Sequence, residues 1–88
     1  MDERFKLSVL FDWYGPLLSD RQRDCYDLYY NEDYSLAEIA ELKGISRQGI
    51  WDAIHHAEDN LREYEEKTGL IKRIMELESE LERKNNGI

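Results

Sequence analysis

Apolar residues recur at helical spacing from the first residues of this chain onward. In residues 3–14, Phe5, Val9 and Trp13 stand four positions apart. Residues spaced three or four apart lie on one face of a helix. The two residues that follow are a glycine and a proline, which break helices, so the pattern predicts a short first helix over residues 3–14.

Two serines mark helix starts through a capping-box pattern. In this pattern a serine oxygen accepts a free backbone N–H of the first turn, and a Glu or Gln three residues later reaches back to the serine N–H. Ser19 with Gln22 predicts a second helix, which the polar residues 31–33 end. Ser35 with Glu38 predicts a third helix, which is short.

A fourth and a fifth helix follow closely. Gly44 is a left-handed cap for the end of the third helix, and Ser46 caps the start of the fourth. The third helix is expected to turn four residues inward, Leu36, Ile39, Ala40 and Leu42. The fourth carries an apolar stripe at spacings of 4, 3, 4 and 3, formed by Ile50, Ile54, Ala57, Leu61 and Tyr64. Thr68 and Gly69 weaken or break this stripe. With no strand pattern present, we predict an all-α fold of about five helices, frayed from Lys84 onward.

The third and fourth helices match a helix-turn-helix, which is two helices joined by a tight turn that contains glycine. Counted from Leu36, the fifth position must be small where the helices cross, and it is Ala40. The ninth position must be glycine for the left-handed turn, and it is Gly44. Among the apolar positions of the motif only Lys43 departs, while the others are Ile39, Ile45, Ile50 and Ala53.

This motif divides the chain into two parts. We predict a helix-turn-helix at residues 35–60 within a domain of residues 1–66, followed by a C-terminal amphipathic helix over residues 67–88. The C-terminal helix has a seam at spacings of 4, 3 and 4, formed by Leu70, Ile74, Leu77 and Leu81. Such a seam is typical of coiled coils, although this one is short. It docks on the core of its own chain or forms a homodimer; we favour the dimer, which would place two recognition helices on one partner.

The second helix of the motif, the recognition helix, lies in the DNA major groove with its N-terminal residues on base edges. Its outward positions are Ser46, Arg47, Gln48, Trp51, Asp52 and His55, and all but Asp52 are candidate binding residues. Arg47 suits a guanine edge or a phosphate, and Gln48 suits adenine. Arg21 and Arg23 are candidate contacts to the nucleic-acid backbone. The alternative is that all are ordinary solvated residues, which is the favoured interpretation for Arg21 and Arg23.

Two residues of the recognition helix have more than one interpretation. Trp51 would be an exposed aromatic anchor if it faced outward, but a core residue if it packed against Tyr29 or Tyr30, and we favour the core. Gly49 costs about 1 kcal/mol relative to alanine inside a helix. Close packing explains this glycine more simply than close approach of a nucleic-acid backbone.

The charge balance argues against broad nucleic-acid binding. The 88 residues suffice for one small domain, with 20 acidic and 12 basic residues and a net charge of -8. Proteins that bind nucleic acid usually carry a basic face. However, residues 43–51 contain two basic residues and no acid. The acidity therefore confines nucleic-acid binding to one small face and leaves a role as an adaptor between proteins open.

Several kinds of chemistry are excluded by what the sequence contains. Cys25 is the one cysteine, so no intramolecular disulfide can form, and we expect its thiol to be buried. Since nothing here requires an oxidising compartment, we expect a cytoplasmic location. No apolar run is long enough to insert into a membrane. His55 and His56 are adjacent and diverge on a helix, so no metal site is expected. Neither a catalytic triad nor a phosphate-binding glycine loop is evident, so we expect no enzyme activity and no cofactor.

The chain resembles the YlxM-like family of small bacterial helix-turn-helix proteins. The resemblance extends from about residue 7 to 72 and depends on five segments, LFDWYG (10–15), LLSDRQR (17–23), YSLAEIAE (34–41), GISRQGIWD (44–52) and YEEK (64–67). The middle portion also resembles the promoter-reading C-terminal helix-turn-helix of bacterial sigma factors. Three positions depart from the family pattern: His55 and His56 stand where basic residues are frequent, and Gly49 replaces a commoner alanine. The C-terminal helix is also short for the family.

This resemblance implies a role that the composition and spacing alone do not. YlxM-like proteins are associated with the signal recognition particle pathway, so the resemblance implies a regulator that binds nucleic acid, in DNA or RNA, or associates with particle components. The alternative is an acidic adaptor that keeps the fold but docks on a protein such as the targeting GTPase.

Overall fold

This computed structural model describes residues 2–86, which contain five α-helices and one short 3-10 helix. In chain order they are α1 (Glu3–Tyr14), η1 (Gly15–Leu17), α2 (Asp20–Tyr30), α3 (Leu36–Lys43), α4 (Arg47–Thr68) and α5 (Leu70–Asn86). No strand occurs within residues 2–86, so the all-α prediction is confirmed. The expected fraying from Lys84 is not seen, because α5 continues to Asn86.

The predicted serine caps are present at three helix starts. At α3 the capping box is complete, since Ser35 accepts from the Glu38 N–H and the Glu38 side chain accepts from the Ser35 N–H. At α2 only half of the box forms. Ser19 Oγ accepts from the Gln22 N–H at 3.2 Å, but the Gln22 side chain accepts from Asn60 Nδ2 at 3.2 Å and thereby joins α2 to α4.

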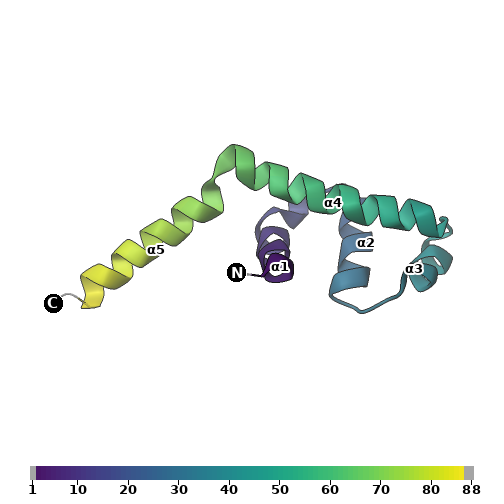
Figure 1. The fold of residues 1–88 in the computed structure, drawn as a ribbon, viewed down its shortest axis with the longest axis horizontal. Coiled ribbons are helices and arrows are strands. Elements are labelled where there is room, and N and C mark those ends of the chain that lie inside the picture. Colours follow the sequence, from purple (N-terminus) through teal and green to yellow (C-terminus); the bar gives the residue numbers. More distant parts are fainter. Residues whose placement is uncertain (1, 87–88) are drawn as a thin grey trace.

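The long helix α4 is the spine of the fold, and α1, α2 and α3 lie along one side of it (Figure 1). Two adjoining apolar clusters fill the space between them. One gathers around Ala57 and Leu61 of α4 and includes residues of α1 and α2. The other gathers around Ile50 and Ile54 of α4 and includes Ile39 of α3. The helix-turn-helix thus has its own cluster on a shared spine.

The buried faces of α1 and α3 differ in part from the sequence pattern. Phe5 and Trp13 are 56% and 54% exposed, and α1 instead buries Leu7, Leu10 and Tyr14. Both sets have helical spacing, so periodicity alone does not choose between them. In α3, Leu36, Ile39 and Ala40 contribute to the second cluster as expected, but Leu42, in the last turn of the helix, lies outside that cluster and is 61% exposed.

Helix α5 leaves the body of the protein at a sharp bend (Figure 1). The radius of gyration is 16.4 Å, compared with about 12 Å for a compact chain of this length. The bend is at Gly69, which ends α4 because it adopts a left-handed conformation with a φ of 62°. Of the α5 side chains described, at residues 70–85, only Ile71 is buried in the core of the body.

Three polar side chains fix this bend, and no local pattern in the sequence predicts them. Tyr14 Oη donates to Glu65 Oε1 at 2.6 Å and lies 2.7 Å from Thr68 Oγ1. The two Glu65 oxygens also accept from the backbone N–H groups of Ile71 and Lys72, each at 3.1 Å. Glu65 therefore caps α5 from the preceding helix. We call Tyr14, Glu65 and Thr68 the elbow cluster.

The elbow cluster shifts the pKa values of two of its members. Burial raises the pKa of the Tyr14 hydroxyl, and its bond to Glu65 raises it further. Burial also tends to raise the pKa of Glu65, but the bonds from Tyr14 and the two α5 N–H groups outweigh it, so the pKa of Glu65 is lowered. Glu65 is therefore held as a carboxylate at the N-terminus of α5, where the helix dipole favours negative charge.

Candidate nucleic-acid interface

The turn between α3 and α4 has the expected helix-turn-helix geometry. Gly44 is left-handed, with a φ of 67°, and the Ile45 N–H donates to the Ala40 carbonyl at 3.1 Å. Ile39 before the turn and Ile50 after it are fully buried. Lys43, the one polar departure from the motif, forms a 3.2 Å ion pair with Asp24 of α2. The turn therefore makes α4 the second helix of the motif.

Gly49 is present because the first turn of α4 is tightly packed. A Cβ at this position would lie 2.7 Å from Ile45 Cγ2 and 3.2 Å from Ser46 Oγ. The Ile45 methyl group is attached directly to a branched Cβ and has little freedom to move away. The prediction of close packing is therefore confirmed.

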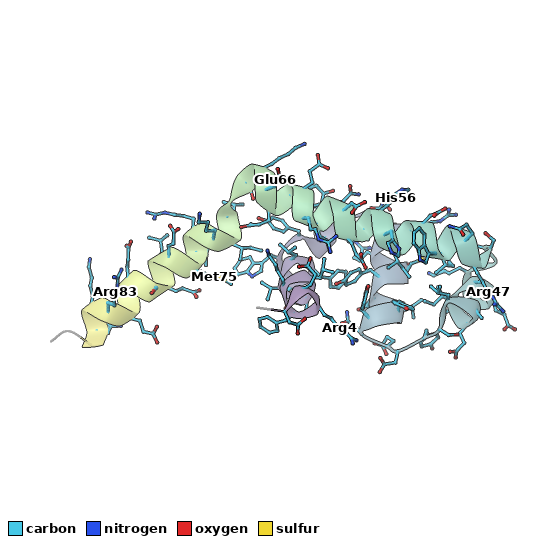
Figure 2. All side chains as sticks on the ribbon, in the orientation of Figure 1. Arg4, Arg47, His56, Glu66, Met75 and Arg83 are labelled. Atoms are coloured by element: carbon cyan, nitrogen blue, oxygen red, sulfur yellow. The ribbon has the colours of Figure 1, made fainter. Side chains whose placement is uncertain are left out.

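The predicted binding residues of α4 lie on one surface at the end of the helix farthest from α5. Figure 2 shows Arg47 at this end and Arg83 near the opposite end of the molecule. Arg47, Gln48 and Trp51 are exposed, and His55 is half-buried one turn further on. The Ser46 hydroxyl accepts from the Gly49 N–H at 3.0 Å, so its oxygen serves the helix cap.

Trp51 lies on the surface, and the expectation that it belongs to the core is wrong. It is 45% exposed and its ring stacks on His55, with centroids 3.7 Å apart and planes 24° apart. The ring nitrogen Nδ1 of His55 lies 2.9 Å from the Trp51 carbonyl oxygen, which anchors the imidazole. Successive helical residues diverge by about 100°, so the burial of Ile50 turns Trp51 away from the core. Tyr29 and Tyr30, its expected partners, instead pack edge to face on each other.

Few positive charges surround this surface. Gln48 Nε2 donates to Asp52 Oδ1 at 2.9 Å, so a carboxylate is bonded to one of the candidate binding residues. Arg23 of α2 is paired with Asp20 at 2.9 Å, while Arg21 is exposed. The pair at Arg23 and Asp20 favours the solvated interpretation for that arginine. The surface therefore offers hydrogen-bond donors and an aromatic ring, but not a row of basic side chains that could contact successive phosphates.

A small hollow that the sequence pattern does not predict lies beside Trp51. It has a volume of about 230 Å³ and is lined by Leu36, Arg47, Gln48 and Trp51. Leu36 is the first residue of α3 and is only half-buried, so part of it faces the hollow while the rest packs on the core. Only the exact approach of α3 to α4 creates this hollow, which no local pattern encodes.

The α5 seam remains largely uncovered. Leu70, Leu77 and Leu81 are 54%, 42% and 61% exposed, and Ile74 is half-buried. The neighbouring Ile71 docks on the core instead. Docking of α5 on its own chain therefore uses a different residue and leaves the seam free for another contact.

Among residues 2–86, no three His, Cys, Asp or Glu side chains lie close enough together to hold a metal ion. Within the same range, no helix has both the length and the apolar character needed to cross a bilayer. Cys25 is fully buried, and burial raises the pKa of its thiol, as expected for a structural cysteine.

The architecture defines a helix-turn-helix protein, and comparison with known proteins identifies the family. Residues 1–86 match the family UPF0122 of YlxM / p13 like helix-turn-helix proteins. The chain belongs to this family, which confirms the resemblance seen in the sequence.

Three relatives illustrate the similarity. UPF0122 protein TTE1463 of Caldanaerobacter subterraneus subsp. tengcongensis is 48% identical over 93% of this chain and 70% of its own length. A UPF0122 protein of Thermoanaerobacter sp. is 47% identical over 100% of this chain and 76% of its own. A UPF0122 protein of Clostridium perfringens is 50% identical over 84% of this chain and 66% of its own.

Proposed function

We propose that this chain is a non-enzymatic regulator that binds nucleic acid through the N-terminal half of α4. The chief support is the exposure of Arg47, Gln48 and Trp51 on the second helix of a well-formed helix-turn-helix. In this motif the same part of the second helix contacts base edges. Ser46 and His55 border this surface, and Arg21 would contact the nucleic-acid backbone beside it. Arg23 is a weaker candidate because it is paired with Asp20.

The cellular setting that we propose is the signal recognition particle pathway in the cytoplasm. The pathway is implied by the YlxM-like resemblance, and the RNA of the particle is then a candidate ligand. The lone buried thiol of Cys25 agrees with a compartment where disulfides are not formed.

Arg47→Ala tests the binding surface. We expect it to weaken binding of the target nucleic acid by about 1–3 kcal/mol, because the guanidinium would lose a base-edge or phosphate contact. Binding is measured by fluorescence anisotropy over a salt titration, in which the wild-type affinity falls steeply with salt if phosphates are engaged. Arg83→Ala, an exposed arginine on α5, is the control and should bind as wild type. Unchanged binding by Arg47→Ala would remove the assignment of this surface.

A second candidate function is that of an adaptor between proteins. It is favoured by a groove of about 580 Å³ between α1 and α5, with an apolar floor that includes Val9, Leu10, Ile71 and Met75. An apolar helix face of a partner such as the targeting GTPase would fit this shape. Pull-down with and without nuclease separates the two functions, since a protein partner bound directly is retained after the nucleic acid is destroyed.

We further propose that the exposed α5 seam forms a homodimer. Its flanks are complementary in charge, with Arg73 on one side and Glu78 on the other. In a parallel pairing with heptad spacing, Arg73 of one copy would face Glu78 of the second. Dimerisation would cover three exposed leucines and present two recognition helices.

Leu77→Glu tests this dimer. The wild-type mass in sedimentation is expected to rise with concentration from 10.6 kDa towards twice that value, whereas Leu77→Glu stays monomeric because it places a charge in the seam. Leu42→Glu is the matched control, since Leu42 is equally an exposed leucine but lies on α3. A wild-type mass that does not depend on concentration would contradict the dimer.

A further inference from the structure

We infer that the hollow beside Trp51 receives a single unpaired nucleobase, stacked on the free face of the Trp51 ring. This inference rests on the proposed function and deepens it, because it names single-stranded nucleic acid as the ligand class. Leu36, Arg47 and Gln48 form the rest of the site.

The Trp51 ring is held ready for stacking. His55, one turn towards the C-terminus, covers one face of the indole at 3.7 Å and is itself anchored to the Trp51 carbonyl. The hollow is lined by residues one turn towards the N-terminus, Arg47 and Gln48, and does not include His55. His55 therefore covers one face of the ring, and the proposed base would stack on the face that His55 leaves free. A ring fixed in this way loses little side-chain entropy when a base stacks on it.

The lining of the hollow suits a base in size and chemistry. Its volume of about 230 Å³ lies below the roughly 300–1,000 Å³ of sites for drug-sized ligands. Leu36 and Trp51 provide apolar contact for the ring. The Gln48 amide and the Arg47 guanidinium provide hydrogen bonds for the base edge.

The charges around the site favour an unpaired base over a duplex. Duplex binding draws much of its affinity from many lysine or arginine contacts to phosphate. Here Arg47 is the one basic residue that lines the hollow, Gln48 is bonded to the carboxylate of Asp52, and Arg23 is paired with Asp20. Stacking of a base on an aromatic ring does not itself use contacts to phosphate, and it contributes roughly 1–3 kcal/mol per base in other proteins. A single stacked base therefore suits a protein with a net charge of -8 better than a duplex does.

The two tryptophans of the chain allow a direct test. Trp13 is 54% exposed and lies on α1, away from the hollow, so it is a matched control for Trp51. We would titrate the full chain with a 12-nucleotide single-stranded RNA, the same sequence as single-stranded DNA, and the corresponding blunt DNA duplex. Trp13→Phe reports emission from Trp51 alone, and Trp51→Phe reports emission from Trp13 alone.

We expect single strands to quench Trp51 emission and the duplex not to do so, with Trp13 emission unchanged. Trp51→Ala should weaken single-strand binding about 10- to 100-fold, the loss expected from one stacked base, while Trp13→Ala has no effect. Quenching by the single-stranded RNA but not by the single-stranded DNA would identify RNA as the source of the base. Equal quenching by the two single strands would show that the base is bound whichever sugar carries it. Circular dichroism checks that each variant keeps its helices.

Two outcomes would overturn the inference, and they differ in what they say of the proposed function. If the duplex binds, Arg47→Ala weakens it, and single strands leave Trp51 emission unchanged, the base site is wrong while the proposed function stands. If neither the single strands nor the duplex binds the wild-type chain, both are wrong.

Discussion

Ile39→Ala is expected to lower the free energy of unfolding by about 2–5 kcal/mol, the usual loss for truncating a fully buried isoleucine. Ile39 is completely buried in the cluster that joins α3 to Cys25 of α2 and to Ile50 and Ile54 of α4. Helix α3 has only eight residues and cannot be stable alone, so it depends on this anchor. The measurement is urea unfolding followed by circular dichroism, with a lower midpoint and an unchanged dependence on urea.

Leu42→Ala is the matched control for that experiment. It replaces a large aliphatic residue by alanine in the same helix, but Leu42 is 61% exposed. We expect a change within about 0.5 kcal/mol, as for most surface substitutions. Equal losses at the two positions would mean that α3 does not present Ile39 to the core.

Local signals were enough to predict the helix-turn-helix. Ser35 and Ser46 act on backbone N–H groups within their own first turns. Gly44 ends α3 through a conformation that glycine adopts without strain. Each signal depends on residues a few positions away, and for that reason the bounds of α3 and the start of α4 could be predicted from the sequence.

The choice of buried face could not be predicted in the same way. Periodicity allowed both Phe5 with Trp13 and Leu7 with Tyr14 as the inner face of α1. The packing of α1 against α4 chooses the second pair, and the Glu3–Arg62 ion pair at 2.9 Å fixes the same side. Single exposed apolar residues are common on protein surfaces, so the size of Phe5 and Trp13 does not place them in the core.

The elbow cluster was beyond prediction for a different reason. Tyr14 and Glu65 are 51 residues apart in sequence, and their bond exists only after α1 and α4 have packed. The sequence signal for it is slight, since a glutamate four residues before a glycine is common in helices. Long-range polar contacts of this kind require the tertiary structure.

Glu65→Ala is expected to lower the free energy of unfolding by about 2–3 kcal/mol at pH 7. The substitution removes the acceptor of the Tyr14 hydroxyl and of two N–H groups at the start of α5, and hydrogen bonds to a carboxylate are stronger than neutral ones. It also removes the negative charge from the N-terminus of α5. Chemical denaturation at pH 7 measures the loss. Glu66→Ala is the control, because Glu66 is exposed and takes the neighbouring position in α4.

The pH dependence of this loss identifies its cause. The pKa of Glu65 is lowered in the folded chain, so the charged form is favoured by folding. Its contribution is therefore fully present above the unfolded value of about 4.3 and is lost as the pH falls through the lower folded value. The difference in unfolding free energy between wild type and Glu65→Ala should narrow from pH 7 to pH 3. The difference between wild type and Glu66→Ala should stay small at both. If the difference in unfolding free energy between wild type and Glu65→Ala did not change with pH, the side chain would stabilise the bend by packing and not as a carboxylate cap of α5.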